Sequence, residues 1–435
     1  MKPSRASSLR RDLLSWFDRH RRDLPWRRTR DPYRIWVSEV MLQQTRVEAV
    51  LPYYERFLFR FPSVDELASA PIDQVLALWS GLGYYRRARQ LHAAARRIAD
   101  MGDFPRTVAR LLELPGIGAY TAAAVASIAF GVAAPVLDGN VERVIARRLA
   151  LAQDPKRGAS RSLLMAAAAA LLDPSRPGDS NQALMELGAM VCLPRRPRCL
   201  LCPLRPGCGA AGEGRPELYP PPRRRRPTEV RRLLVAVVAS REEPDRVLLF
   251  RRSRQFPEAA PGSSSGEGMP AGAWELPWLE LEDEQAPPPR VRPATRALRG
   301  MPHGHPGRAA AATGDRPSRC LARKYGGDWR LGPALAVVRH GITYRDLRVT
   351  VCGADLCSAG ADEVREGIES GWFDAGERSA LPMSALVGKV LRARAAAAAT
   401  VAGEGRDAAA GTGTASAAAE VSGGRASRSR SRPPG

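Results

Sequence analysis

The chain has 435 residues, and its 67 lysine and arginine residues against 45 acidic ones give a formal net charge of +22. It contains no run of about 18 apolar residues, which argues against a membrane-spanning helix. Its seven cysteines are too few for a disulfide-built scaffold of this length. The excess of positive charge favours a polyanionic partner such as a nucleic acid.

Residues 1–215 are predicted to form a helical domain. Apolar residues recur there at helical spacing, in segments separated by Gly, Pro or Asp. These segments are 35–50, 64–79, 88–98, 121–130, 141–151 and 162–172. The Arg/Ser-rich N-terminus has no apolar signal core, and Asp12, Asp18 and Asp23 argue against an organellar transit peptide. We therefore expect a cytoplasmic, bacterial protein associated with the nucleoid.

A second domain is predicted at residues 230–394, after a stiff Pro/Arg linker at 216–229. Its apolar pattern is that of an α+β fold. Residues 233–239 and 246–251 are expected to be paired strands. Two further strands are expected at 335–338 and 347–352, and two helices are expected at 361–370 and 386–394.

Three stretches are expected to lack regular structure. Residues 257–270 and 284–318 are rich in Pro, Gly, Ala and Arg, which is typical of loops or disordered insertions. Residues 395–435 are rich in Ala, Gly and Ser and carry scattered arginines, so we expect a disordered tail.

A glycine-rich turn at 114–122 opens onto the predicted helix 121–130. The free N–H groups of such a turn form a small anion site that suits a backbone phosphate. Pro115, Gly116 and Gly118 are the candidate contacts, because the two glycines permit close approach and positive φ. Taken alone, the pattern is more often an ordinary connection between helices.

Four of the seven cysteines are gathered in one loop, at Cys192, Cys199, Cys202 and Cys208. Four thiolates on a compact loop can hold either a tetrahedral zinc ion or a [4Fe–4S] cluster. The spacing alone favours a zinc ion over a [4Fe–4S] cluster. Under either metal, the first role of the site is structural, because it fixes a loop that also carries several arginines.

Two carboxylates have positions that suit chemistry. Glu39 is expected on a helix beside Ile35 and Leu42, where an apolar setting would raise its pKa and keep it protonated; its other interpretation is a solvated helix glutamate. Asp138 precedes an apolar-periodic segment, so on sequence alone it is an N-cap. A protonated and an ionised carboxyl group together suit the cleavage of glycosidic bonds.

The glycine-rich turn, Asp138 and the four-cysteine loop together resemble the helix-hairpin-helix DNA glycosylase superfamily, and the chain is most similar to its MutY-type adenine DNA glycosylases. The resemblance covers 10–210 almost without gaps and 230–390 more loosely. It implies a helical glycosylase domain followed by an α+β, MutT-like (Nudix-fold) domain. The segments that carry it are Leu24-Pro25-Trp26-Arg27, Val37-Ser38-Glu39-Val40-Met41-Leu42-Gln43-Gln44-Thr45, Leu78-Trp79-Ser80-Gly81-Leu82-Gly83-Tyr84-Tyr85 and Asn181-Gln182-Ala183-Leu184-Met185-Glu186-Leu187-Gly188-Ala189.

The resemblance assigns roles to the residues of the helical domain. It implies that Glu39 protonates adenine at N7 and that Asp138 stabilises the cationic sugar, with Tyr120 and Asn140 orienting the pair. Bifunctional relatives carry a lysine nucleophile where this chain has Tyr120, and no lysine occurs between Lys2 and Lys156. A monofunctional glycosylase that leaves an abasic site is therefore expected.

Other positions match residues that contact the substrate. Gln44 and Tyr84 resemble the wedge residues that prise the duplex while the target base leaves the stack. Trp26, Arg27 and Gln182 match positions that line the adenine pocket. The resemblance also favours a [4Fe–4S] cluster over zinc at the four cysteines, because the family's four cysteines hold such a cluster.

In the second domain, the resemblance points to recognition of 8-oxoguanine. The stretch 291–300 has no acidic residue, so diphosphate hydrolysis of the Nudix type is not expected. Thr343 keeps the hydroxyl of the family's recognition loop, whereas Ile342 and Tyr344 depart from the family pattern.

The sequence thus predicts a monomeric, monofunctional adenine DNA glycosylase that acts on A·8-oxoguanine and A·G mispairs in double-stranded DNA. An endonuclease III-like glycosylase for thymine or oxidised pyrimidines is the enzymatic alternative. A non-catalytic DNA-binding protein with a structural zinc ion is the alternative from another class.

Overall fold

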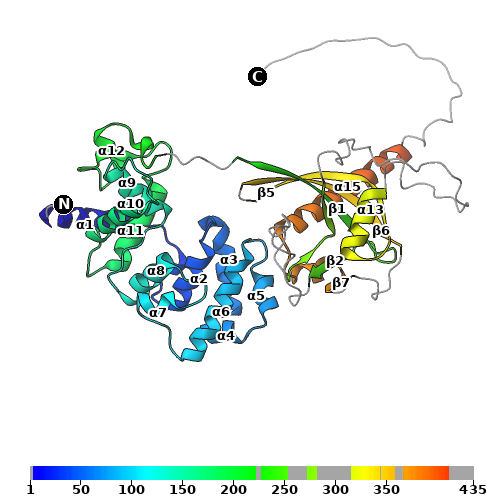
Figure 1. Ribbon diagram of the computed structural model, residues 1–435, viewed down its shortest axis with the longest axis horizontal. Helices are drawn as coiled ribbons and strands as arrows, with labels where there is room; N and C mark the ends of the chain where they lie inside the picture. Colours follow the sequence, from blue (N-terminus) through cyan, green and yellow to red (C-terminus); the bar gives the residue numbers. More distant parts are fainter. Residues whose placement is uncertain are drawn as a thin grey trace, which may run out of the picture.

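The computed structural model describes residues 3–221, 227–252, 272–281, 315–342, 344–357, 365 and 367–410. They form a helical domain followed by an α+β domain (Figure 1). The predicted succession of fold classes is confirmed. None of the described helices is long and apolar enough to cross a lipid bilayer.

The helical domain surrounds one apolar core that includes Trp36, Phe57 and Trp79. Three short 3-10 helices accompany its α-helices: η1 (Pro25–Arg27), η2 (Cys199–Leu201) and η3 (Pro216–Leu218). The α-helices are α1 (Pro3–His20), α2 (Pro32–Met41), α3 (Val47–Arg60), α4 (Val64–Ser69), α5 (Ile72–Leu78), α6 (Tyr85–Met101), α7 (Val108–Leu112), α8 (Ala119–Phe130), α9 (Gly139–Arg148), α10 (Gly158–Ala170), α11 (Pro177–Met190) and α12 (Gly209–Gly212).

Polar caps set where several of these helices begin. Asp31 accepts from the backbone N–H groups of Tyr33 and Arg34 at the start of α2, and Ser63 forms a capping box with Glu66 at the start of α4. The predicted helix 35–50 is in fact two helices, α2 and α3, with a turn at 42–46 between them. At this turn, the last carbonyls of α2 also accept hydrogen bonds from a buried arginine, which is described below.

The described residues of the α+β domain form two β-sheets, ordered β4-β1-β6-β5 and β3-β2-β7. Strands β1 and β6 pair in parallel, and every other registered pair is antiparallel. The strands are β1 (Glu229–Val238), β2 (Val247–Arg252), β3 (Trp274–Glu275), β4 (Trp278–Leu281), β5 (Trp329–Ile342), β6 (Arg345–Leu356) and β7 (Ile368–Phe373).

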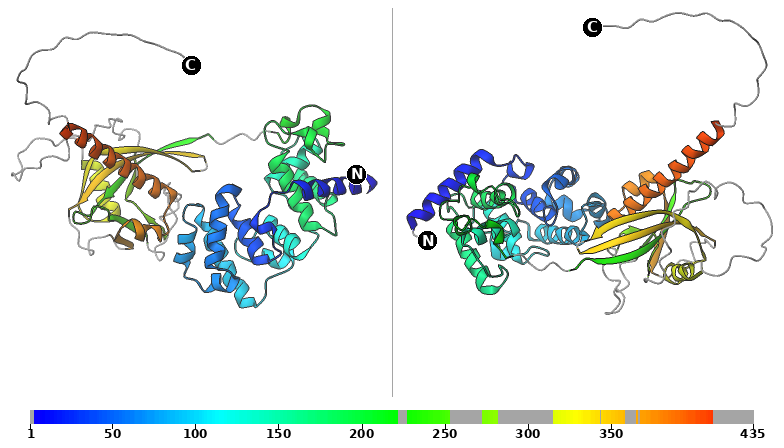
Figure 2. Two further views of the ribbon diagram at one scale, coloured as in Figure 1. Left: turned by 180° about the vertical axis from the view of Figure 1, so that it is seen from behind. Right: turned by 90° about the horizontal axis from the view of Figure 1, so that it is seen from above.

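Helices complete the second domain and cover its sheets (Figure 2). Leu386, Val387 and Val390 of α15 (Ala385–Ala410) pack against β1 and β6, while Leu321 and Tyr325 of α13 (Asp315–Tyr325) pack in a separate apolar cluster. The short helix α14 (Ala375–Ser379) follows β7 and is capped by Asp374.

Two expectations for this domain were wrong. Residues 233–239 and 246–251 belong to different sheets, because β4 and β6 occupy the two edges of β1; only Ala239 and Val247 form an isolated bridge. Residues 368–370, which were expected to be helical, lie in β7, whose backbone pairs with β2. In both cases, the structure of the segment depends on pairing with strands far away in the chain, which local composition does not reveal.

The predicted limits of two unstructured stretches also change. Helix α15 continues to Ala410, past the expected start of the tail at residue 395, because alanine has the highest helix propensity. Helix α13 begins at Asp315, inside the predicted insertion 284–318. The remaining tail, 411–435, and the insertion 257–270 lie outside the described residues.

The two domains contact each other beside α5 and the turn that follows it (Figures 1 and 2). The hydroxyl of Ser80 donates to the carbonyl oxygen of Met383 at 3.0 Å, and the hydroxyl of Tyr85 donates to the same oxygen. Arg251 of β2 lies 3.5 Å from a carboxylate oxygen of Asp73 in α5. The second domain therefore rests against the segment that carries Tyr84.

Candidate active site

A cavity of about 1030 Å³ opens in the helical domain, and polar side chains from several helices line it. It brings together ten of the predicted site residues: Trp26, Arg27, Glu39, Gln44, Gly116, Gly118, Tyr120, Asp138, Asn140 and Gln182. Tyr84 and Pro115 are not part of this lining. Thr343 lies outside the described residues.

Glu39 reaches the cavity from α2, and only 6% of its surface is exposed. Burial raises the pKa of its carboxyl group to about 7, with a further increase from the nearby charge of Asp138. Hydrogen bonding from Tyr120 and the positive charge of Arg27 oppose this rise. Glu39 can therefore exist protonated near neutral pH.

Tyr120, in the first turn of α8, is the hydrogen-bond partner of Glu39. Its hydroxyl donates to Oε2 of Glu39 at 2.7 Å and lies 3.1 Å from Sδ of Met185. Burial and the two neighbouring carboxylates raise the pKa of Tyr120 well above 10, so the phenol stays protonated and remains a donor. No lysine lines the described cavity.

Asp138 is both the N-cap of α9 and part of the cavity wall. Its Oδ1 accepts from the backbone N–H of Val141 at 2.7 Å, and its Oδ2 accepts from Nδ2 of Asn140 at 3.0 Å. Burial raises the pKa of Asp138 above its ordinary value, and these donors and Arg143 oppose only part of that rise. The donors favour the anion, so the cap also holds a carboxylate in place.

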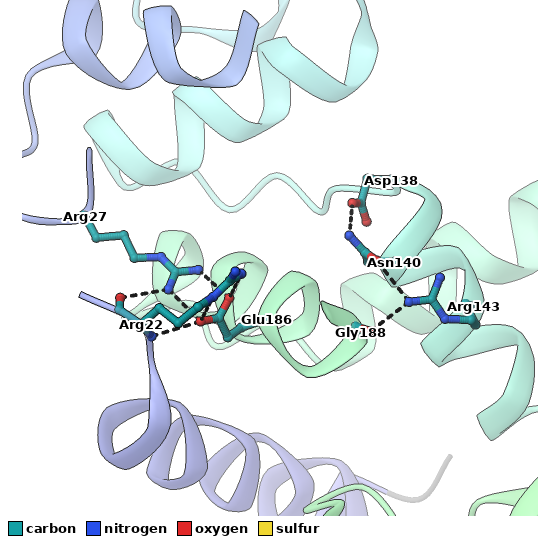
Figure 3. A network of polar contacts seen from close by, with 7 residues as sticks. All are labelled: Arg22, Arg27, Asp138, Asn140, Arg143, Glu186 and Gly188. Carbon is teal, nitrogen blue, oxygen red and sulfur yellow. Dashed lines mark hydrogen bonds and ion pairs between the residues drawn. The ribbon is translucent and has the colours of Figure 1, made fainter. Parts of the chain in front are cut away.

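Arg143 connects this pair to Gly188 of α11 (Figure 3), and it also bonds to the cysteine loop. Its guanidinium donates to Oδ1 of Asn140 at 3.0 Å, to the carbonyl of Gly188 at 2.7 Å and to that of Cys192 at 2.7 Å. Helix α11 approaches this closely because residue 188 is glycine: a Cβ there would lie 2.6 Å from Cβ of Asn140.

Arg27 and Glu186 form a buried ion pair at the other end of the cavity, a contact that sequence reasoning did not identify (Figure 3). Nη1 and Nη2 of Arg27 each donate at 2.9 Å to an oxygen of Glu186, and Arg22 donates to both oxygens as well. Burial raises the pKa of Glu186, but the two arginines outweigh it and lower the pKa to about 2. An acidic residue in the largely apolar stretch 181–189 was the signal available in the sequence.

The glycine-rich turn joins α7 to α8 at the edge of this cavity. Gly116 has φ of +76°, and a Cβ there would lie 2.6 Å from Cβ of Gln90, so both the conformation and the space require glycine. Gly118 is the N-cap of α8 and has no side chain to cover the first N–H groups of the helix. These features suit a phosphate, as predicted from the sequence.

The four clustered cysteines line one small cavity of about 30 Å³, together with Arg147, Arg148 and Leu204. Nη1 of Arg147 lies 3.4 Å from Sγ of Cys192. Burial raises the pKa of the Cys202 thiol to about 12, so its thiolate needs a cation to compensate for burial. Within the described residues, no compact group of three or more metal-binding side chains forms a single-ion site.

Comparison with known proteins agrees with this arrangement. Residues 37–168 match the HhH-GPD superfamily of base excision DNA repair proteins. Over this segment the chain is similar to that superfamily, and the curated relatives it matches include adenine DNA glycosylases.

Two curated relatives illustrate the similarity. The adenine DNA glycosylase of Rattus norvegicus is 41% identical over 316 residues, which are 64% of this chain and 61% of the relative. That of Homo sapiens is 49% identical over 216 residues, covering 47% and 40%. The chain thus spans about half the length of the relatives it matches. The solved structure of a thermostable thymine-DNA glycosylase is 30% identical, with a TM-score of 0.45, and covers 48% of this chain and 98% of that one.

Proposed function

We propose that this chain is a monofunctional adenine DNA glycosylase that removes adenine mispaired with 8-oxoguanine or guanine during base excision repair. The observation that carries the proposal is the pairing of a buried carboxyl group of raised pKa, Glu39, with a hydrogen-bonded carboxylate, Asp138, in one cavity. Hydrolysis of an N-glycosidic bond needs such a pair, because the base must be protonated while the sugar becomes cationic.

Glu39 acts as the acid in this scheme. With a pKa of about 7, roughly half of the Glu39 population carries a proton at neutral pH. It transfers this proton to N7 of the extruded adenine, which makes the base a better leaving group. Tyr120 holds the carboxyl group in position through its 2.7 Å hydrogen bond.

Asp138 stays ionised and stabilises the oxocarbenium-like sugar. The N–H of Val141 and the amide of Asn140 fix both of its oxygens, so the carboxylate needs little rearrangement as charge develops. Because the residue at the hairpin is Tyr120 and no lysine lines the described cavity, water completes the reaction and an abasic site remains.

Three further residues form the adenine pocket. Trp26 and Gln182 are each less than one-tenth exposed, and both line the cavity together with Arg27. Trp26 offers an aromatic face for the base, and Gln182 offers an amide for its polar edge. Glu186 fixes Arg27 at the border of this pocket.

Double-stranded DNA is the proposed partner of the whole chain. The net charge of +22 and the exposed glycine-rich turn suit its phosphates. Gln44 and Tyr84 enter the duplex as wedges, and Thr343 reads the base opposite adenine. We further propose that the protein acts as a monomer.

Cys192, Cys199, Cys202 and Cys208 hold a [4Fe–4S] cluster in this proposal, with zinc as the alternative. Their common cavity and the positive neighbours Arg147 and Arg148 suit a group ligated by thiolates. The bound group fixes the loop 192–208. Iron analysis and visible absorbance of the purified protein test the assignment, and a colourless protein that contains zinc contradicts it.

Single-turnover cleavage of A·8-oxoguanine, A·G, T·G and A·T duplexes, with and without alkali, tests the activity. We expect adenine release from the first two duplexes and strand breaks only after alkali. Cleavage of T·G alone would support a thymine glycosylase, and breaks without alkali would contradict the monofunctional assignment. Glu39→Gln should abolish release while DNA binding persists, and Glu142→Gln, in the first turn of α9 and outside the cavity lining, is the matched control.

A further inference from the structure

Arg87 lies in the first turn of α6, and only 8% of its surface is exposed. Its side chain extends between two turns of the helical domain. We call residues 42–46, between α2 and α3, the Gln44 turn, and residues 80–84, between α5 and α6, the Tyr84 turn.

One side of the guanidinium binds the Gln44 turn and the end of α2. Nη1 donates to the carbonyl oxygens of Val40 and Met41, each at 2.9 Å, and also to that of Gln43. Nη2 lies 3.2 Å from Oγ1 of Thr45. Arg87 thus provides donors to carbonyls at the end of α2, where the regular helical bonds stop.

The same guanidinium binds the Tyr84 turn. Nη2 donates to the carbonyl oxygen of Gly83 at 3.3 Å and lies 3.5 Å from that of Leu82. The guanidinium carbon is 5.4 Å from the ring centroid of Tyr84 and 5.5 Å from that of Trp79, which are cation–π distances. A single side chain thus fixes both turns at once.

The residues at the tips of the two turns share an unusual backbone. Gln44 has φ of 58° and Tyr84 has φ of 51°, in the left-handed region that side chains with a Cβ seldom adopt. Both side chains are exposed, whereas Arg87 is buried. Such conformations persist only where surrounding contacts impose them. Arg87 bonds to Gln43 and Thr45 on either side of Gln44, and to Gly83 directly before Tyr84.

Ion pairing does not explain the burial of Arg87. Among the residues that the structure describes, no carboxylate forms an ion pair with it, and burial lowers its pKa to about 10, which still leaves it charged at neutral pH. Backbone carbonyls therefore compensate the charge. A planar fork with several donors suits this better than a point charge, because it can bond in two directions while stacking on a ring.

We propose that Arg87 is a positioning residue for base extrusion, and that its guanidinium fixes the distance between the Gln44 and Tyr84 turns so that both wedges enter the duplex together. The proposal rests on the proposed glycosylase function and adds a residue through which the wedges act. Arg87 itself contacts neither the base nor the sugar. Its effect is on the cost of unstacking adenine, not on the cleavage step.

Arg87→Lys is the decisive variant, because lysine keeps the charge but lacks the planar fork. Single-turnover rates are measured on two A·8-oxoguanine duplexes, one fully paired around the lesion and one with mismatches flanking the adenine. We expect a rate about 10- to 100-fold below wild type on the first duplex, and a much smaller deficit on the second, whose adenine is already weakly stacked. Fluorescence of a 2-aminopurine placed beside the target should rise less than with wild type.

Three variants control the interpretation. Arg86→Lys makes the same exchange at the exposed neighbouring residue and should retain wild-type rates. Glu39→Gln should lose activity equally on both duplexes, because its defect is chemical. Thr45→Val removes one acceptor of Arg87 while keeping the arginine, and should give a smaller deficit with the same dependence on the duplex, even if Arg87→Lys fails to fold.

The outcomes separate the two proposals. If wild type releases no adenine from either duplex, the glycosylase function fails. If wild type is active but a folded Arg87→Lys is equally slow on both duplexes, or gives wild-type 2-aminopurine fluorescence, Arg87 is not a positioning residue for extrusion. If Arg87→Lys does not fold and Thr45→Val shows no dependence on the duplex, the inference is overturned as well.

Discussion

Removal of the Tyr120 hydroxyl should move the pH dependence of adenine release in a defined direction. The hydroxyl donates to Oε2 of Glu39 at 2.7 Å and thereby lowers the pKa of Glu39, which burial nevertheless keeps at about 7. A hydrogen bond to a charged group contributes about 1.5–3 kcal/mol, which corresponds to about 1–2 pKa units. In Tyr120→Phe, the pKa of Glu39 therefore rises by about that amount.

The assay is the single-turnover rate of adenine release between pH 5 and 9. If Glu39 is the acid, the wild-type rate falls as pH rises through about 7, because the proton donor is lost. In Tyr120→Phe, the fall should occur at higher pH, and the maximal rate should be lower because the carboxyl group is less well oriented. Tyr219→Phe removes another hydroxyl that donates to a glutamate, Glu213, but at an exposed site, and should leave the profile unchanged. An alkaline limb that stays in place or moves to lower pH in Tyr120→Phe would refute the assignment.

Three further variants test other parts of the site. The folded-state pKa of Glu39 lies above its ordinary value of 4.5, so its contribution to stability is lost as pH rises through about 7. Glu39→Gln should therefore raise the free energy of unfolding by about 3 kcal/mol at pH 8 and much less at pH 4. Urea denaturation at the two pH values measures this difference. Glu186→Gln should lower that free energy by about 3 kcal/mol at pH 7, because it leaves Arg27 buried without its carboxylate, and should move the alkaline limb of the rate to lower pH. Thr343→Ala should reduce the preference for 8-oxoguanine over guanine, and an equal loss on both duplexes would remove the case for Thr343 as the reader of that base.

The sequence predicted the parts of the molecule that depend on local pattern. The long helices and the N-cap at Asp138 follow from apolar spacing and from the residues at helix ends. The burial of Glu39 was expected only from the family resemblance, because its local pattern also suits a solvated glutamate. The strand pairing of the second domain did not follow, because β1 and β2 are similar apolar strands and only their partners place them in different sheets. Two helices also extend or begin where composition had predicted disorder.

The buried arginines were the least predictable part of the candidate site. The chain has 67 lysine and arginine residues, and nothing in the local sequence distinguishes Arg87 from exposed Arg86 except its position on the apolar face of a helix. The partners of Arg87 and Arg27 come from segments far apart in the chain, such as the carbonyl of Val40 and the carboxylate of Glu186. A motif can include such residues without revealing what they bind.

Two glutamates of nearly equal burial line this cavity, and their neighbours give them opposite protonation states. Glu186 receives four side-chain donations from Arg22 and Arg27, which hold its pKa near 2, whereas Glu39 receives one hydrogen bond from a neutral phenol and keeps a pKa of about 7. The ion pair between Glu186 and Arg27 also affects the pKa of Glu39. Both terminal nitrogens of Arg27 are bound to Glu186, so this nearby cation lowers the pKa of Glu39 less than an unpaired arginine would. Burial is the main cause of the raised pKa of Glu39, and the charged Glu186 weakens one influence that opposes it. For that reason, Glu186→Gln and Tyr120→Phe should shift the pH profile in opposite directions.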